Sequence, residues 1–239
     1  MSSLQTARGE AALFRACAGP FLVFLAFSLL LFVADGSWQW NHPSAPWYQR
    51  APEMFIYPLQ VVGCAVYIWY IRKGISWRAS LKSCLLGALA GVVGISAWLI
   101  PYVAGWIPNE GGFEPELIFG ENTVAIVVEY VFRFARAALI VPIVEELFWR
   151  GYLMRWCINR DFPQNVPLGQ GSWVSYVVVT AAFMFAHNPV DYAGAFVYGS
   201  IAYLLVIRTK CLLPVILMHA VANLIMGICA IALDLPQLW

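Results

Sequence analysis

Two adjacent carboxylates, Glu145 and Glu146, precede Arg150 at the end of a long apolar stretch of the chain. Ionised side chains are costly inside a bilayer, so their presence in such a stretch indicates a functional site. On a helix, Glu146 and Arg150 share a face and favour an ion pair, whereas Glu145 points about 100° away from Glu146. The spacing therefore predicts a structural ion pair and one free carboxylate, Glu145, that faces a cavity. The alternative to a functional site is a structural cluster of charged side chains that reach from the helix to the membrane boundary.

Two further pairs of polar or aromatic side chains occur downstream. Phe183 and His187 are four residues apart, as are His219 and Asn223, so each pair shares a helix face. A single histidine in a membrane helix is explained equally well by a hydrogen bond to a neighbouring helix. Together with an unpaired glutamate, however, these side chains supply a general base, an imidazole that orients water and two donors for an oxyanion.

Other catalytic classes find no support in the chain. There is no G-x-S-x-G segment and no cysteine next to a histidine, so a serine or cysteine hydrolase is unsupported. The absence of H-E-x-x-H excludes an ordinary zincin. The six cysteines are scattered without a C-x-x-C pair, which indicates neither a disulfide framework nor a thiolate zinc site.

The composition is that of a protein with several membrane-spanning helices. Hydrophobic residues make up 62% of the chain and charged residues 11%, with a mean hydropathy of +0.73. These values lie well outside those of soluble proteins. The net charge of +1 gives no reason to expect a nucleic acid as partner. The expected fold class is all-α: a polytopic membrane helix bundle with about seven transmembrane helices.

Several apolar stretches are expected to cross the membrane, and we number them in chain order. They cover about residues 16–34, 54–71, 81–103, 122 to beyond 150, 172–187, 192–207 and 212–233. The fourth is too long for one straight crossing, and Pro142 is expected to kink it just before the glutamates. In the third, Gly87, Gly91 and Gly94 approximate the small-residue spacing that lets helices pack closely. Asp191 is expected to cap the sixth.

Residues 1–239 are expected to form a single membrane domain. Its first three spans, within residues 16–105, carry no motif that we can assign. Residues 122–232 are expected to form a four-span catalytic core, because they contain the two glutamates and both of the downstream pairs described above. A cleaved signal peptide is the alternative explanation of the first span, although the residues that follow it make a poor cleavage site.

The basic residues predict the orientation of the chain in the membrane. With the N-terminus in the cytoplasm, the segments on that side contain Arg8, Arg15, Arg72, Lys73, Arg78, Lys82, Arg155, Arg160, Arg208 and Lys210. Arg50 falls in an outside loop. Because cytoplasmic loops are enriched in lysine and arginine, we expect a multi-pass protein of the cell membrane with a cytoplasmic N-terminus and an outside C-terminus. The acidic loop from Glu110 to Glu121 then lies outside.

The three motifs together resemble those of the CPBP family. E-E-x-x-x-R with a following Gly-x-Leu, then F-x-x-x-H, then H-x-x-x-N, occur in that order on successive membrane helices. The CPBP family comprises type II CAAX prenyl endopeptidases and bacteriocin-processing and self-immunity proteins. The resemblance covers about residues 122–232, and the triple motif is specific. The chain as a whole is most similar to the bacterial CAAX-protease-related branch.

The resemblance implies a role for each motif residue. Glu145 corresponds to the catalytic glutamate, and His187 would help it to activate the attacking water. His219 and Asn223 would stabilise the tetrahedral oxyanion. The residues expected to support the site are Glu146, Arg150 and Phe183.

The function implied is that of a membrane-embedded endopeptidase. Glutamate-activated water would hydrolyse a peptide bond of a membrane-associated protein or peptide, in the lipid bilayer and without a cofactor. In a zinc-dependent alternative, Glu145, His187 and His219 would form a His₂Glu ligand set. A transporter could instead use intramembrane Glu and His as a proton relay, but it would be expected to have repeated halves, and none is found. A non-catalytic membrane scaffold or immunity factor is the remaining alternative.

Overall fold

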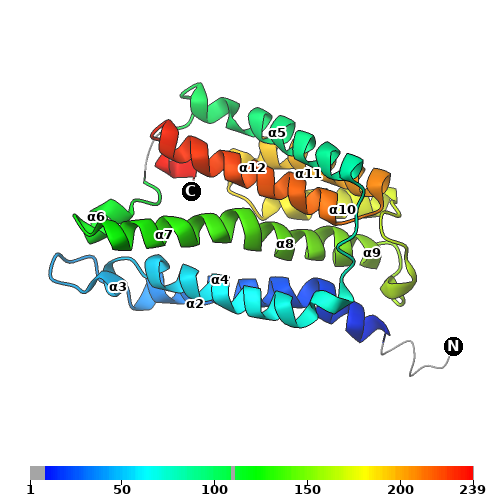
Figure 1. The fold of residues 1–239 in the computed structure, drawn as a ribbon, viewed down its shortest axis with the longest axis horizontal. Helices are drawn as coiled ribbons and strands as arrows, with labels where there is room; N and C mark the ends of the chain where they lie inside the picture. Colours follow the sequence, from blue (N-terminus) through cyan, green and yellow to red (C-terminus); the bar gives the residue numbers. More distant parts are fainter. Residues whose placement is uncertain (1–8, 109–110, 239) are drawn as a thin grey trace.

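The computed structural model describes residues 9–108 and 111–238 (Figure 1). Within these residues the regular structure consists of α-, π- and 3₁₀-helices, and no β-strand is present. The predicted all-α fold class is confirmed. The chain is a helical bundle of the kind expected for a multi-pass membrane protein.

Among the described residues, 5 helices are long and apolar enough to cross a membrane. They contain α2 (Gly19–Ser37), α4 (Glu53–Ile71), α5 (Leu81–Val103), α11 (Tyr192–Thr209) and α12 (Leu213–Ala232). These helices correspond to the first, second, third, sixth and seventh predicted spans. Short helices connect or extend them: η1 (Phe14–Ala18), α3 (Trp47–Arg50), η2 (Arg72–Gly74), α6 (Pro115–Phe119), η5 (Pro163–Asn165), η6 (Pro189–Asp191) and η7 (Pro236–Leu238).

The fourth and fifth predicted spans depart from simple membrane helices. The fourth is a helical run divided by π-helical turns: α7 (Thr123–Ala135), η3 (Arg136–Ile140), α8 (Val141–Glu146), η4 (Leu147–Leu153) and α9 (Met154–Trp156). The fifth, α10 (Trp173–Phe185), is apolar but has only 13 residues. The irregularity predicted at Pro142 is therefore a π-helical segment that ends just before it. Such segments occur often at functional sites.

The divided helix α7–α9 forms the middle of the bundle. In Figure 1, α2 and α4 lie on one side of it and α5, α11 and α12 on the other. Contacts of α12 with η3 and α8, and of α4 with α7 and η3, agree with this arrangement. Arg136 of η3 donates a hydrogen bond of 2.6 Å to Gln60 of α4. The segment next to the two glutamates is thus anchored on one side by α4 and contacts α12 on the other.

Close packing of α5 against α12 sets the depth of His219. A Cβ atom on Gly87 would collide with the backbone of Pro214, and one on Gly91 with the backbone of Met218. This confirms the predicted close approach at these glycines and shows that the two helices run parallel. Because Gly91 is ten residues after the start of α5, the neighbouring His219 lies roughly 15 Å along α5, at about 1.5 Å per residue.

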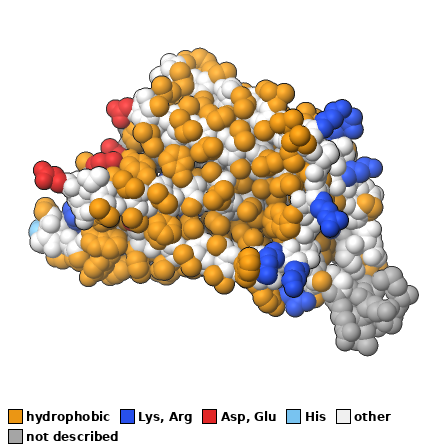
Figure 2. All heavy atoms as spheres, in the orientation of Figure 1, with side chains coloured by type: hydrophobic (Ala, Val, Ile, Leu, Met, Phe, Trp, Pro, Cys, Tyr) orange, Lys and Arg blue, Asp and Glu red, His pale blue; other side chains and the backbone are white. Residues whose placement is uncertain are grey.

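The surface combines an apolar belt with ends of opposite charge. Figure 2 shows hydrophobic side chains over most of the visible face, Lys and Arg at the end near the N-terminus, and Asp and Glu at the opposite end. Large apolar side chains such as Trp69 and Leu204 are exposed. An apolar surface of this extent is expected to contact lipid.

Candidate active site

A cavity of about 120 Å³ lies where α5, α8, α11 and α12 meet the loop after α10. Its lining contains all four side chains predicted to be catalytic: Glu145, His187, His219 and Asn223. The remaining lining residues are Ile95, Trp98, Val141, Phe183, Tyr198, Ala222 and Met226. Residues from three separate sequence motifs are thereby brought to one enclosed place in an apolar bundle.

Glu146 and Arg150 form the predicted ion pair, and both side chains are fully buried. Arg150 Nη1 lies 3.0 Å from Glu146 Oε1. Arg150 Nη2 donates to the Gly199 carbonyl of α11 at 3.3 Å, and the guanidinium lies 4.9 Å from the centre of the Phe183 ring. The pair therefore connects α8, η4, α10 and α11, and it lies outside the cavity lining.

Glu145 is half-buried and lines the cavity. Its carboxylate accepts a hydrogen bond of 3.3 Å from the indole nitrogen of Trp149. The two adjacent glutamates thus differ as their helical spacing predicts, since one is held in an ion pair and the other faces a hollow. A carboxylate facing a cavity is able to accept a proton from water held there.

His187 lies just beyond the end of α10, so the predicted helical end at residue 187 was two residues too long. Pro189 disfavours a helical conformation at the residue before it. His187 Nδ1 is 2.7 Å from the Phe183 carbonyl. A carbonyl only accepts, so this geometry assigns the proton to Nδ1 and leaves Nε2 as an acceptor in the neutral ring.

His219 shares its carboxylate partner with Arg150. Its Nδ1 lies 3.0 Å from Glu146 Oε1, the same oxygen that accepts from Arg150. The contact assigns a proton to Nδ1. In the neutral ring, Nε2 is then an acceptor, and it becomes a donor when the ring is protonated.

Asn223 is positioned by an irregularity in the backbone of η3. In this segment the Val141 N–H bonds the Arg136 carbonyl. The next donor in the π-helical register would be residue 142, but Pro142 has no N–H. The Ala137 carbonyl instead accepts from the Asn223 side-chain amide at 2.8 Å. One amide hydrogen and the side-chain oxygen of Asn223 remain available.

The sequence of this region matches a known protease family. Residues 127–225 match the family model described as Rce1-like, type II CAAX prenyl endopeptidase. These residues belong to the CPBP family. The matched CPBP segment contains every residue of the three motifs and covers less than half of the chain. The match indicates a membrane protease of the CAAX type.

Comparison of the chain with curated proteins and with solved structures found no match. The family assignment therefore rests on the CPBP segment and its motifs.

The cavity also contains residues that the motifs do not include. Trp98 of α5, outside the CPBP segment, packs edge-on against His187, with ring centres 5.2 Å apart. Asp191 accepts hydrogen bonds of 2.8 Å from both Trp98 and Tyr102. Asp191 was expected to cap α11, but no side-chain cap bond is present, because its carboxylate is turned toward α5 instead. Sequence spacing carries no signal for contacts of this kind between helices.

The next question is whether the cavity residues could also bind a metal ion. Among residues 9–108 and 111–238, no group of three or more His, Cys, Asp and Glu side chains is arranged to hold a metal ion. Glu145, His187 and His219 line the same hollow without forming such a group. One of the two ring nitrogens of His219, Nδ1, is also hydrogen-bonded to Glu146.

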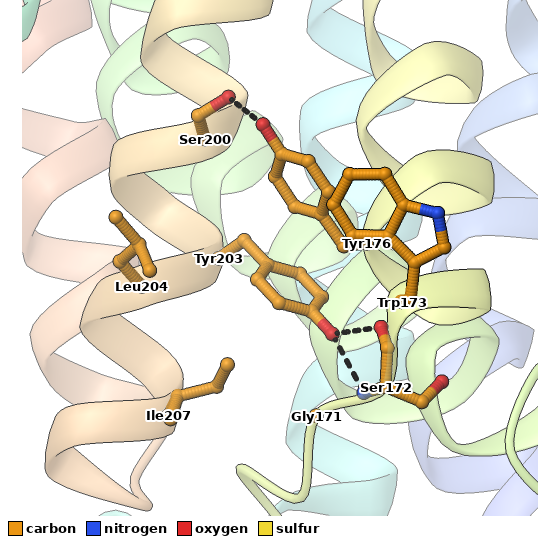
Figure 3. A pocket seen from close by; sticks show the side chains of 8 residues that line it. All are labelled: Gly171, Ser172, Trp173, Tyr176, Ser200, Tyr203, Leu204 and Ile207. Atoms are coloured by element: carbon orange, nitrogen blue, oxygen red, sulfur yellow. Dashed lines mark hydrogen bonds between the residues drawn. The ribbon is translucent and has the colours of Figure 1, made fainter.

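A larger hollow of about 500 Å³ lies between α10 and α11 (Figure 3). Tyr203 lines it and accepts a hydrogen bond from the Ser172 backbone N–H at 3.1 Å. Its hydroxyl also lies 2.6 Å from the Ser175 hydroxyl. No motif residue lines this hollow. The smaller cavity, which contains the motif residues, remains the candidate active site.

Proposed function

We propose that the protein is an intramembrane endopeptidase in which Glu145 activates water to hydrolyse a peptide bond of a membrane-associated protein or peptide. The observation that carries this proposal is the shared cavity of Glu145, His187, His219 and Asn223. A carboxylate outside the buried ion pair, an imidazole and an amide around one space are the groups that such a hydrolysis needs. The Rce1-like match supports the reaction class.

In the proposed first step, water is held by two acceptors, the Glu145 carboxylate and His187 Nε2. Glu145 takes one proton from the water while the water oxygen forms a bond to the scissile carbonyl carbon. The carbonyl oxygen becomes an oxyanion. The carbon–nitrogen bond then breaks, and the proton on Glu145 passes to the leaving amine. The products are a carboxylic acid and an amine, and Glu145 returns to its starting state.

Stabilisation of the oxyanion requires donors. Asn223 retains one amide hydrogen beside the bond that it gives to Ala137. His219 Nε2 donates when the ring carries both protons, and Glu146 accepts from its other nitrogen. We therefore propose a protonated His219 in the reacting state, with the Glu146 carboxylate orienting the ring. Donors aimed at the developing charge are often the largest single contribution to catalysis.

We further propose that the end of the molecule rich in Lys and Arg faces the cytoplasm, which puts the N-terminus inside and the C-terminus outside the cell membrane. The separation of charges in Figure 2 supports this orientation. Arg8, and Glu110 of the acidic loop, lie outside the described residues. The orientation would place the cavity within the bilayer, partway along the bundle.

The catalytic core proposed at residues 122–232 includes the whole CPBP segment. The first three spans, within residues 16–105, carry no motif, yet Ile95 and Trp98 of α5 line the cavity. We therefore propose that the first three spans complete the site within one membrane domain.

The proposed activity can be tested without knowing the substrate, by searching the cell's own membranes for proteins and peptides that the enzyme cleaves. Membranes from cells that produce wild type or Glu145→Gln are compared by mass spectrometry. We expect specific membrane-associated proteins or peptides to accumulate uncut with Glu145→Gln. The family's description makes a farnesylated CAAX peptide a defined second probe. Identical membrane peptides in both samples would contradict the protease proposal and favour a scaffold.

A further inference from the structure

Tyr198 of α11 has a buried hydroxyl that finds no hydrogen-bond partner within residues 9–108 and 111–238. Its side chain is 3% exposed, and the described residues supply no partner to its oxygen. Buried tyrosine hydroxyls usually find a partner, and leaving one unpaired costs free energy of folding. A group retained at such a cost calls for an explanation in function.

Tyr198 lies in the candidate active site. It lines the cavity together with Glu145 and His219. Its ring centre is 5.8 Å from that of His219 and 6.1 Å from that of Phe183. The ring of Tyr198 therefore lies among the side chains of the candidate active site.

The ring of Tyr198 is held in place from several sides. Trp98 of α5 packs against it with a centre distance of 6.1 Å. A Cβ atom on Gly94 would lie 2.8 Å from Tyr198 Cδ2, so the ring occupies space that only a glycine leaves free. A group fixed in this way needs no reorganisation when charge develops nearby.

The other polar hydrogens around the cavity are mostly committed. The Nδ1 protons of His187 and His219 bond Phe183 and Glu146, and one amide hydrogen of Asn223 bonds Ala137. The Tyr198 hydroxyl is a donor with no acceptor among the described residues. We propose that it donates a hydrogen bond to the carbonyl oxygen of the scissile peptide, and that this bond strengthens as the oxygen becomes an oxyanion. The proposal rests on the proposed function, and no proton leaves the tyrosine.

Tyr203, on the same helix, is a matched control. It is also 3% exposed, but its hydroxyl is bonded to Ser172 and Ser175. It lines the larger hollow rather than the catalytic cavity. The same change, tyrosine to phenylalanine, therefore removes a buried hydroxyl without a partner among the described residues at one position and a paired structural hydroxyl at the other.

The test compares Tyr198→Phe, Tyr203→Phe and Glu145→Gln in cells, with their own membrane peptides as probe. Tyr198→Phe should accumulate the same uncut peptides as Glu145→Gln, and Tyr203→Phe should not. With a synthetic copy of one such peptide and purified protein, kcat of Tyr198→Phe should fall about 10²- to 10³-fold, as for loss of one oxyanion donor. KM should change little.

Thermal unfolding supplies a readout that does not depend on the substrate. Tyr198→Phe should unfold at or above the wild-type temperature, because no hydrogen bond is lost, whereas Tyr203→Phe should unfold below it. The role of Tyr198 would be overturned if Tyr198→Phe cleaved the peptides as well as wild type. It would also be overturned if Tyr198→Phe lost as much stability as Tyr203→Phe. If Glu145→Gln itself changes no peptide, the proposed function fails together with the role of Tyr198. If Glu145→Gln accumulates peptides and Tyr198→Phe does not, the role of Tyr198 fails alone.

Discussion

Glu146 Oε1 lies 3.0 Å from both Arg150 Nη1 and His219 Nδ1, so one buried carboxylate oxygen joins a structural ion pair to a residue of the cavity. The second contact goes beyond the pairing that the helical spacing predicted. Glu146 is therefore more than the partner of Arg150, because it also sets the orientation of the His219 ring. The adjacent Glu145 takes no part in this arrangement and faces the cavity.

Substitution of the two glutamates should have different consequences. Glu146→Ala leaves Arg150 and His219 without their carboxylate partner in a buried setting. Removal of one partner of a buried ion pair typically costs about 3–5 kcal/mol, so we expect a low yield and a clearly lower unfolding temperature in detergent. Glu145→Gln should unfold near the wild-type temperature. An equal loss of stability in both variants would contradict the separation of their roles.

The sequence predicts the residues of the cavity better than it predicts their contacts. Glu145, His187, His219 and Asn223 could be selected because each motif is local to one stretch of chain and helical spacing determines which side chains share a face. The bond between His219 and Glu146 joins residues 73 positions apart. It depends on how α12 packs against α8, which spacing within either helix does not encode.

The same distinction applies to the fold. Hydropathy located the long helices closely, since α5 covers the predicted residues 81–103. It did not reveal the π-helical turns on either side of the glutamates, because these depend on backbone register. It also could not identify Tyr198, which is one of 11 tyrosines and has its cavity neighbours on other elements.

Gly91 provides a test of the packing that positions His219. A Cβ atom there would collide with the backbone of Met218, which cannot move as a flexible side chain would. Gly91→Ala should therefore lower the unfolding temperature and reduce activity, since the displaced residue is next to His219. Gly36→Ala in α2 is the control, because a Cβ atom at Gly36 meets nothing within 4 Å. It should be neutral or slightly stabilising. Similar stability of the two variants would show that α5 and α12 are not closely packed.

The orientation can be measured with reporter fusions. A reporter joined after Lys73 should be active in the cytoplasm, because it extends from the basic end of the bundle. A reporter joined between Glu114 and Glu116 should be active outside. A cytoplasmic signal from the second fusion would contradict the proposed orientation, including the outside C-terminus.

His219 distinguishes glutamate-activated water from a zinc mechanism. In the proposed scheme it stabilises the oxyanion, and loss of one such donor costs about 10²- to 10³-fold in kcat. His219→Gln retains a hydrogen-bond donor but is a poor zinc ligand, so it should keep measurable activity, and chelator-treated wild type should remain active. Metal analysis that finds one zinc per chain, with activity lost on chelation and restored by zinc, would instead assign Glu145, His187 and His219 as ligands.

The most direct test of the account is the cleavage rate of purified Glu145→Gln on a peptide that accumulates uncut in its membranes. The glutamine has nearly the same size and still accepts hydrogen bonds, but it does not take a proton from water. We predict a rate about 10²- to 10⁴-fold lower than that of wild type, which is the usual contribution of a general base. The unfolding temperature should be unchanged. Cleavage of that peptide at a rate near the wild-type value would contradict the role of Glu145.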